Sequence, residues 1–170
     1  MIRAAAFALL SLTTIDYAAA CTCVSAVGAN ARTQMGDAAF VFRGLVAEVK
    51  LLPRHPEMRG RQRVAVTFRV NRYWKGAPTR TATLYDLDPG TDCHGFGYEA
   101  GKEYLVYASM NEARDYRLDK DYFWFGWTDI LAPGTKILEP LSCNPGGLTS
   151  ERVVRKALSE LGRGNAPPLP

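Results

Sequence analysis

Apolar side chains recur at every second position along much of the chain, which is the period of β-strands. The clearest stretch runs from Val64 to Tyr73, where Val66, Phe68 and Val70 fall on one face. This alternation predicts a strand with one buried face. Further strands are predicted at Ala39–Leu52, Thr81–Leu87, Glu103–Ser109 and Ile137–Ser142. Several short strands with turns between them predict an antiparallel sandwich or a small barrel.

Proline and glycine mark the breaks between these strands. Lys75-Gly76-Ala77-Pro78 is a predicted turn, and Pro89-Gly90-Thr91-Asp92 is a predicted loop. The break after Leu52 is longer and rich in arginine, so we expect an exposed, basic hairpin loop there. It contains Pro53, Arg54, Pro56, Arg59, Gly60, Arg61 and Arg63.

Two stretches carry helical signals. Ala29 to Asp37 has no proline and predicts a short helix before the first strand. Ser150 to Leu161 predicts a longer helix, because apolar residues recur there at helical spacing and a glycine follows. These residues are Val154, Leu158, Leu161 and Gly162. The last stretch, Arg163 to Pro170, is predicted to be a disordered tail.

The segment before the last strand is the least regular. From Asn111 to Lys120 the charges follow no period, and the next stretch, Tyr122 to Trp127, has five aromatic side chains in six positions. Aromatic side chains at this density need another apolar surface to pack against. Either alternate rings face the core and the others cover one end of the barrel, or the rings form an exposed strip that binds a ligand.

The N-terminus has the features of a secretory signal peptide. Arg3 precedes an apolar run from Ala4 to Leu12, and small residues at 18–20 stand directly before Cys21. The run is shorter than the roughly 20 residues that a membrane-spanning helix needs. We predict cleavage between Ala20 and Cys21, and a mature chain that is secreted or periplasmic and has no transmembrane segment. The predicted organisation is a signal peptide at 1–20, a barrel domain at 21–147, a helix at 148–162 and the tail at 163–170.

All four cysteines follow the signal peptide, in a compartment where thiols tend to pair. They are Cys21, Cys23, Cys93 and Cys143, and two disulfides are the natural interpretation. A one-residue spacer can rarely satisfy disulfide geometry, which argues against joining Cys21 to Cys23 and leaves two other pairings open. Either pairing ties the mature N-terminus to distant parts of the chain. A zinc site built from the four thiolates fits poorly, because there is no second close pair.

The inventory of chemical groups favours a protein that is not an enzyme. The net charge of +4 comes without a basic cluster or an RNA-type motif, so we expect no nucleic-acid partner. His55 and His94 are the only histidines, and there is no nucleophile elbow, zinc helix or phosphate-binding glycine loop. We interpret His55 and Glu57 as solvated loop residues, and we expect no cofactor. A group of acidic residues lacks the other ligands of a calcium loop: Asp86, Asp88 and Asp92.

Several short motifs follow one another in an order that is similar to a known family. Cys21-Thr22-Cys23-Val24 stands at the expected mature N-terminus, and the other motifs follow a helical stretch. They are Val41-Phe42-Arg43-Gly44, Tyr73-Trp74-Lys75-Gly76, Cys93, Glu103-Tyr104-Leu105-Val106 and Cys143. In this order they resemble the tissue inhibitors of metalloproteinases over roughly residues 21–143. The resemblance implies a netrin-like, OB-type barrel of five strands with flanking helices. It also implies disulfides between Cys21 and Cys93 and between Cys23 and Cys143.

The resemblance further implies a partner and a mechanism. The partner is a zinc metalloprotease, and the chain acts on it as a monomer. The α-amino group and carbonyl oxygen of Cys21 bind the catalytic zinc at the position that a water normally holds. The side chain of Thr22 enters the specificity pocket of the protease. The remaining contacts fall to Cys23, Val24 and the loop residues Thr91, Asp92 and Cys93.

The chain also departs from this family. No cysteine lies between Cys23 and Cys93, so the third disulfide of the family's inhibitory domain is missing, and His94 replaces the glycine that follows the loop cysteine. The disulfide-rich C-terminal domain is absent, and 111–134 looks inserted. These features indicate a single-domain, bacterial-type relative whose partner can differ.

Two alternatives describe a binding protein of the cell envelope or extracellular space. A cysteine after small residues also resembles the lipid-attachment site of bacterial lipoproteins, although Ala18 fits that signal poorly. Acylation would block the Cys21 amine, so this alternative and zinc binding exclude each other. The other alternative is an adhesion module that uses the aromatic segment, in which Trp124 and Trp127 would contact the ligand.

Overall fold

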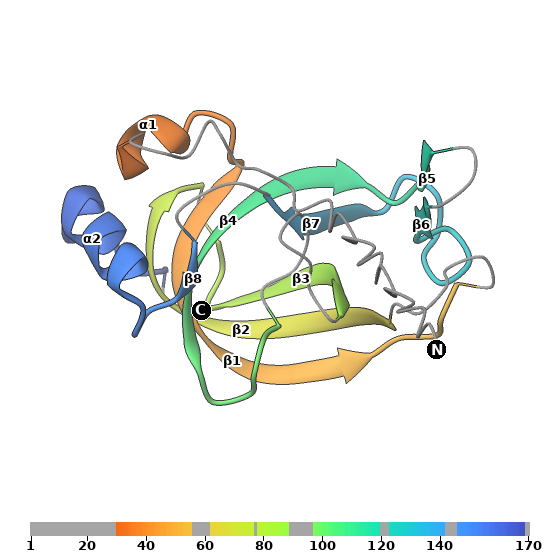
Figure 1. The fold of residues 1–170 in the computed structure, drawn as a ribbon, viewed down its shortest axis with the longest axis horizontal. Helices are drawn as coiled ribbons and strands as arrows, with labels where there is room; N and C mark the ends of the chain where they lie inside the picture. Colours follow the sequence, from red (N-terminus) through yellow and green to blue (C-terminus); the bar gives the residue numbers. More distant parts are fainter. Residues whose placement is uncertain are drawn as a thin grey trace, which may run out of the picture.

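The chain folds into a small β-barrel with helices packed at one end (Figure 1). The computed structural model describes residues 30–55, 62–76, 78–88, 97–119, 123–141 and 146–168. The helices are α1 (Ala31–Gln34) and α2 (Arg152–Leu161). The strands are β1 (Phe40–Leu51), β2 (Gln62–Lys75), β3 (Thr81–Asp88), β4 (Glu103–Glu112), β5 (Asp115–Asp119), β6 (Phe123–Gly126), β7 (Lys136–Pro140) and β8 (Gly147–Leu148).

Five strands close the barrel in the order β1-β2-β3-β7-β4, and β4 pairs back onto β1. This is the predicted OB-like barrel with flanking helices. All but one of the barrel's pairings are antiparallel. The exception is β3 with β7, which is parallel and rests on the single pair Leu84 and Leu138. At this seam a long connection, which includes β4, replaces a hairpin.

The interior of the barrel is the largest apolar core. Val64, Val66, Phe68 and Val70 of β2 all point into it, as the alternation predicts. Gly44 lies where β1 passes closely over β2, because a Cβ there would be 3.0 Å from the carbonyl oxygen of Arg69. Only glycine lets the two backbones approach this closely at a bend of the barrel.

The outward faces of β1 and β4 are covered by the two helices. Val41, Leu105 and Tyr107 point outward into a second apolar cluster with Val154 and Leu161 of α2. The second helix therefore buries much of its predicted apolar stripe. The first helix is shorter than the predicted stretch 29–37, because Asn30 caps α1 and helical backbone ends after Gln34.

The segment 113–135 covers part of the outward face at the other end of the barrel (Figure 1). It contains the hairpin of β5 and β6, which sequence periodicity did not predict. Trp127, which follows β6, is buried with 1% of its surface exposed, and its ring meets Tyr85 of β3 edge-to-face at 5.3 Å between centroids. The Trp127 ring thus packs in a third apolar cluster, while the side chains of 116–125 lie outside the described part.

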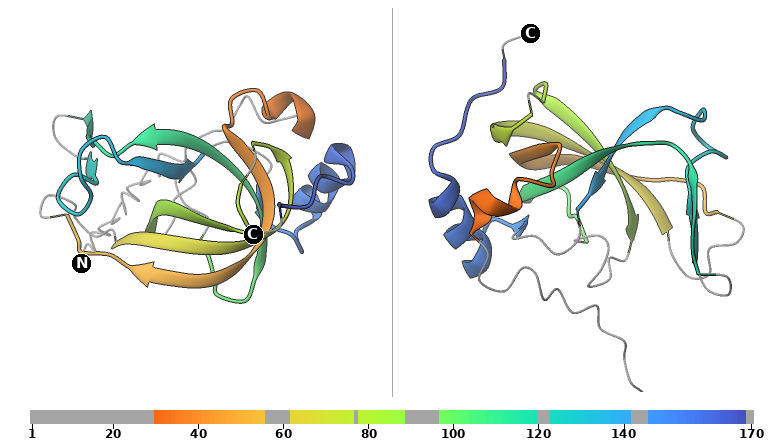
Figure 2. Two further views of the ribbon diagram at one scale, coloured as in Figure 1. Left: turned by 180° about the vertical axis from the view of Figure 1, so that it is seen from behind. Right: turned by 90° about the horizontal axis from the view of Figure 1, so that it is seen from above.

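The chain after α2 runs back along β2, as the right-hand view of Figure 2 shows. Asn165 forms a two-way backbone bridge with Tyr73, with N···O distances of 2.7 and 2.9 Å. Gly164 has a left-handed φ of 65° and lies against the Trp74 ring, so a side chain would not fit there. Residues up to 168 are therefore placed in a stretch for which the sequence predicted no order.

Candidate functional site

The predicted contact residues lie outside the described part of the chain. These are Cys21, Thr22, Cys23, Val24, Thr91, Asp92, Cys93 and Cys143. The two disulfide pairings and the zinc-binding role of Cys21 are therefore untested predictions. The described residues that border these segments are Asn30, Asp88, Gly97, Leu141 and Gly146.

The chain that follows the predicted N-terminal segment is fastened to α2. The backbone N–H of Ala31 donates to the Glu160 carboxylate at 2.8 Å, and the Tyr107 hydroxyl donates to the Ala31 carbonyl at 3.2 Å. In return, the Arg32 guanidinium donates to the carbonyls of Glu160 at 2.7 Å and Leu161 at 3.3 Å. Each helix thus satisfies backbone groups that the end of the other leaves free. Burial raises the pKa of Tyr107, so its hydroxyl stays a hydrogen-bond donor.

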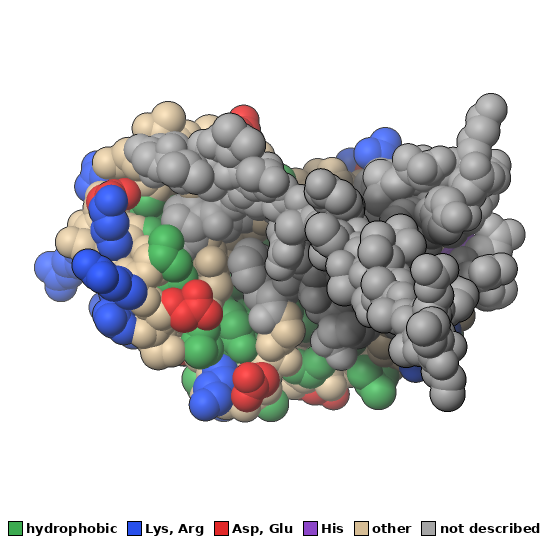
Figure 3. Space-filling view, in the orientation of Figure 1, with side chains coloured by type: hydrophobic (Ala, Val, Ile, Leu, Met, Phe, Trp, Pro, Cys, Tyr) green, Lys and Arg blue, Asp and Glu red, His purple; other side chains and the backbone are tan. Residues whose placement is uncertain are grey.

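The end of the molecule that carries the helices is basic. Lysine and arginine side chains gather there in the space-filling view (Figure 3). Arg152, Arg155 and Lys156 project from α2, and Lys156 lies 3.8 Å from Glu160. The Glu160 carboxylate that holds Ala31 therefore lies among positively charged side chains.

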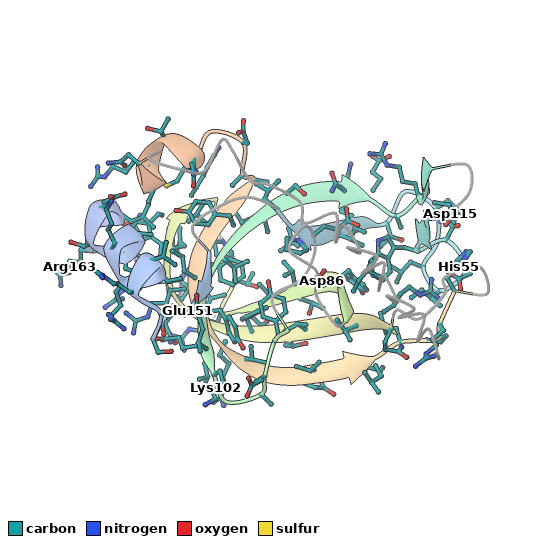
Figure 4. The ribbon with its side chains drawn as sticks, viewed as in Figure 1. His55, Asp86, Lys102, Asp115, Glu151 and Arg163 are labelled. Atoms are coloured by element: carbon teal, nitrogen blue, oxygen red, sulfur yellow. The ribbon has the colours of Figure 1, made fainter. Side chains whose placement is uncertain are left out.

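One acidic side chain lies inside the barrel. Asp86 is 4% exposed, and one of its carboxylate oxygens accepts a hydrogen bond from the Leu87 N–H at 2.7 Å. Figure 4 shows it in the middle of the barrel, whereas His55 and Asp115 lie at the end that carries β5 and β6. Burial, with a further contribution from the charge of Asp86, raises the pKa of Tyr98 well above its ordinary value. The interior is therefore a place where charge is costly.

Arg63, predicted to lie in an exposed basic loop, is fully buried instead. Its guanidinium donates to the carbonyls of Pro53 and Gly126 at 2.7 and 2.6 Å and to both carboxylate oxygens of Asp129 at 2.5 and 2.7 Å. It also lies 5.9 Å from the centre of the Trp127 ring. All of these partners except Pro53 come from the segment 113–135, so that segment supplies most of the acceptors that the buried arginine needs.

A second polar cluster joins the same segment to the barrel. The indole N–H of Trp127 donates to Glu139 at 2.8 Å, and the Asn111 amide donates to the other carboxylate oxygen at 2.5 Å. Sequence patterns gave little sign of either cluster. Two signals were available: Arg63 directly precedes the predicted strand at Val64, and Glu139 lies inside a predicted strand.

Among the described residues, His55 and Asp86 lie in different parts of the molecule (Figure 4). His55 lies in the connection after β1, and Glu57 and Asp92 are outside the described part. Within that part, no three histidine, cysteine or acidic side chains lie close enough together to hold a metal ion. None of the helices described is long and apolar enough to cross a bilayer.

Comparisons with known proteins do not assign the chain to a family. No family model, no curated protein and no solved structure matches it.

Proposed function

We propose that this chain is an exported inhibitor of zinc metalloendopeptidases. In this proposal the freed α-amino group and carbonyl oxygen of Cys21 bind the protease zinc and displace the water that attacks the peptide bond. Thr22 enters the specificity pocket next to the zinc. The rest of the contact ridge is made by Cys23, Val24, Thr91 and Asp92.

The observation that carries the proposal is the fastening of Ala31 behind the predicted N-terminal segment. An inhibitory wedge loses least entropy on binding when it is held in one conformation beforehand. Ala31 is 1% exposed, and both its N–H and its carbonyl are held by side chains from α2 and β4. The segment from Cys21 thus joins a fixed point only ten residues later.

A second observation supports the proposed disulfide between Cys23 and Cys143. Ala31 and Leu141 contact the same apolar cluster, and the Leu141 N–H donates to the Tyr107 carbonyl at 2.9 Å. Two of the chain segments that carry these cysteines therefore leave the barrel at one place. A disulfide there would tie the wedge at Cys23 as well as at Ala31.

The buried position of Trp127 argues against its use as an adhesion surface. Its ring packs inside the third apolar cluster and its N–H donates to Glu139. This packing supports a core role for Trp127 over direct contact with a ligand. Inhibition remains the function that the described framework favours.

The test begins with the protein exported from a native-like host, whose intact mass is measured with and without reduction. We expect a chain that starts at Cys21 and has two disulfides. This material is then compared, against a panel of zinc metalloendopeptidases, with a variant that carries one extra alanine before Cys21. We expect the extension to raise the inhibition constant at least about tenfold, equivalent to ~1.4 kcal/mol.

The extended variant is its own folding control, because the barrel and both disulfides stay intact. Its thermal midpoint should equal that of the unextended protein. The proposal is overturned if Cys21 is acylated, if the correctly processed protein inhibits no member of the panel, or if the extension leaves inhibition unchanged.

A further inference from the structure

Among the described residues, neither the helices nor the segment 113–135 covers the end of the β1-β2-β3 face that carries Arg69 and Thr81. Along β2, Arg63 and Ala65 are buried under that segment, Thr67 is half-buried, and Arg69 is exposed. Along β3, Tyr85 packs against Trp127, whereas Thr81 is exposed. The uncovered part is therefore the end of the β1-β2-β3 face nearest the turn between β2 and β3.

This uncovered face is a groove of about 750 Å³ with four arginines around it. Arg43 lies directly opposite Arg72 across the β1-β2 ladder, and Arg69 lies opposite Thr81 across the β2-β3 ladder. Arg80 stands just before β3, where its carbonyl accepts a hydrogen bond from the Val70 N–H at 2.8 Å. Three strands thus bring together arginines that are spread along the sequence.

A β-bulge explains why so many polar side chains share this face. The register of β1 and β2 shifts between Arg43 and Gly44, which leaves Asn71 as the extra residue of β2. Val70 and Tyr73 both contact the barrel core, so Asn71 and Arg72 between them both point outward. A regular strand would have turned one of the two inward.

The positive charge of the groove is mostly unopposed. Arg43 pairs with Glu103 at 2.8 Å. Among the described residues, Arg69, Arg72 and Arg80 have no carboxylate within ion-pair distance and no side-chain hydrogen bond. Three guanidinium groups around one groove create a strongly positive surface, and their forked geometry matches sulfate and phosphate oxygens.

The far wall of the groove is built by the chain after α2. Ala166 and Pro167 line it, and the bridge between Asn165 and Tyr73 holds them in place. The indole N–H of Trp74 fixes the start of this stretch by donating to the Gly162 carbonyl at 3.0 Å. A groove with a fastened wall and a β-sheet floor is formed before any ligand binds, which lowers the entropic cost of binding.

We propose that this groove binds an anionic glycan, through sulfate or phosphate groups on its sugars. The arginines supply the charge recognition. The amide nitrogen of Asn71 donates to Glu103 at 2.8 Å, and its amide oxygen and the Thr81 hydroxyl are suited to sugar hydroxyl groups. A single-stranded nucleic acid fits less well, because none of the described residues that line the groove is aromatic and base stacking needs such side chains. This site is separate from the proposed protease contacts.

The test is a titration of the full mature protein with dextran sulfate, measured by calorimetry at several salt concentrations. Uncharged dextran of the same length is the matched ligand control, and an oligothymidylate of equal charge distinguishes nucleic acid. We expect dextran sulfate to bind best and uncharged dextran not to bind. The affinity should fall steeply as salt rises, as for other polyanions that release counterions.

Two double variants that lose the same charge locate the site. Arg69→Gln with Arg80→Gln changes exposed groove residues, and Lys50→Gln with Arg152→Gln changes exposed residues outside it. We expect the first variant to bind dextran sulfate at least about tenfold more weakly (~1.4 kcal/mol) and the second to change affinity less than about twofold. Arg80→Gln alone is a further variant. Arg80 lies in the loop before β3, so the change in dextran sulfate affinity that it causes cannot come from a disturbed strand.

Four outcomes would overturn the proposal. They are no binding of dextran sulfate, equal binding of uncharged dextran, tighter binding of the oligothymidylate, and equal weakening by the two double variants. The third would identify a nucleic-acid groove, and the fourth would mean that only the overall charge of the protein attracts the ligand.

Discussion

Arg63 is a fully buried cation whose only anionic partner in the described structure is the partly exposed Asp129. Changing Asp129→Ala removes the acceptors of two guanidinium N–H groups, while the bonds that Arg63 donates to the carbonyls of Pro53 and Gly126 remain. Breaking a fully buried ion pair costs roughly 3–5 kcal/mol. The Asp129 side chain is 37% exposed, so water can enter in its place. We therefore expect a smaller loss, about 2 kcal/mol of unfolding free energy.

A double-mutant cycle separates the pair from its surroundings. In an Arg63→Met background there is no buried charge to satisfy, so Asp129→Ala should then cost about 0.5 kcal/mol or less. The coupling free energy between the two residues is expected to be about 1.5 kcal/mol. Urea unfolding followed by tryptophan fluorescence, with disulfides intact, measures all four proteins.

An exposed ion pair of the same length is the matched control. Lys136 and Glu112 also lie 2.5 Å apart, but both side chains are largely exposed. Glu112→Ala should leave the urea midpoint within error of the unchanged protein, because surface pairs contribute little. Equal effects of the two alanine substitutions, or additive effects within the cycle, would refute the idea that burial of Arg63 is what makes Asp129 matter.

The pH dependence follows from the direction of the Asp129 shift. The hydrogen bonds from Arg63 hold the pKa of Asp129 below its ordinary value. A carboxylate with a lowered folded-state pKa stabilises the fold above its unfolded pKa, about 4, and loses that contribution as the pH falls below it. The difference in stability between the unchanged protein and Asp129→Ala should therefore be constant near neutral pH and shrink below about pH 4.

Two further substitutions test the packing outside and inside the barrel. Trp127→Phe removes the donor to the buried Glu139, leaving one carboxylate oxygen unpaired, so we expect a loss of about 2 kcal/mol in urea unfolding; an unchanged midpoint would mean that water replaces the indole. Gly44→Ala places a methyl group 3.0 Å from the Arg69 carbonyl oxygen and 3.2 Å from Phe68, so we expect overpacking to cost about 1–3 kcal/mol. Its thermal midpoint should fall, and a midpoint equal to that of the parent would show that β1 can move away freely.

The barrel was largely predictable, because each of its strands has one face in a continuous apolar core. The two-residue period at Val64, Val66 and Phe68 is a direct consequence of that burial. The hairpin of β5 and β6 was not predictable, because it pairs outside the main sheet. The parallel pairing of β3 with β7 was also not predictable, because no local sequence pattern shows which distant strand will close a barrel.

The polar features were less predictable than the apolar ones, for a physical reason. The burial of Arg63 depends on Gly126 and Asp129, which are more than sixty residues away in the chain. The arginine groove escaped a search for basic clusters because β1, β2 and β3 each contribute only part of it. The alternation along a strand shows which face a charged residue lies on. It does not show which distant residue it will pair with, because that depends on the tertiary structure.

The exchange of backbone caps between α1 and α2 joins positions 129 residues apart, and this separation determines when the contact can form during synthesis. A chain made from its N-terminus presents Ala31 long before Glu160. Contacts between such distant positions form late, because a long loop must close first. Ala31 and Arg32 therefore gain these contacts only once the chain has been made as far as Leu161. A chain that stopped before Glu160 could build most of the barrel and still lack the bonds that hold α1 to α2.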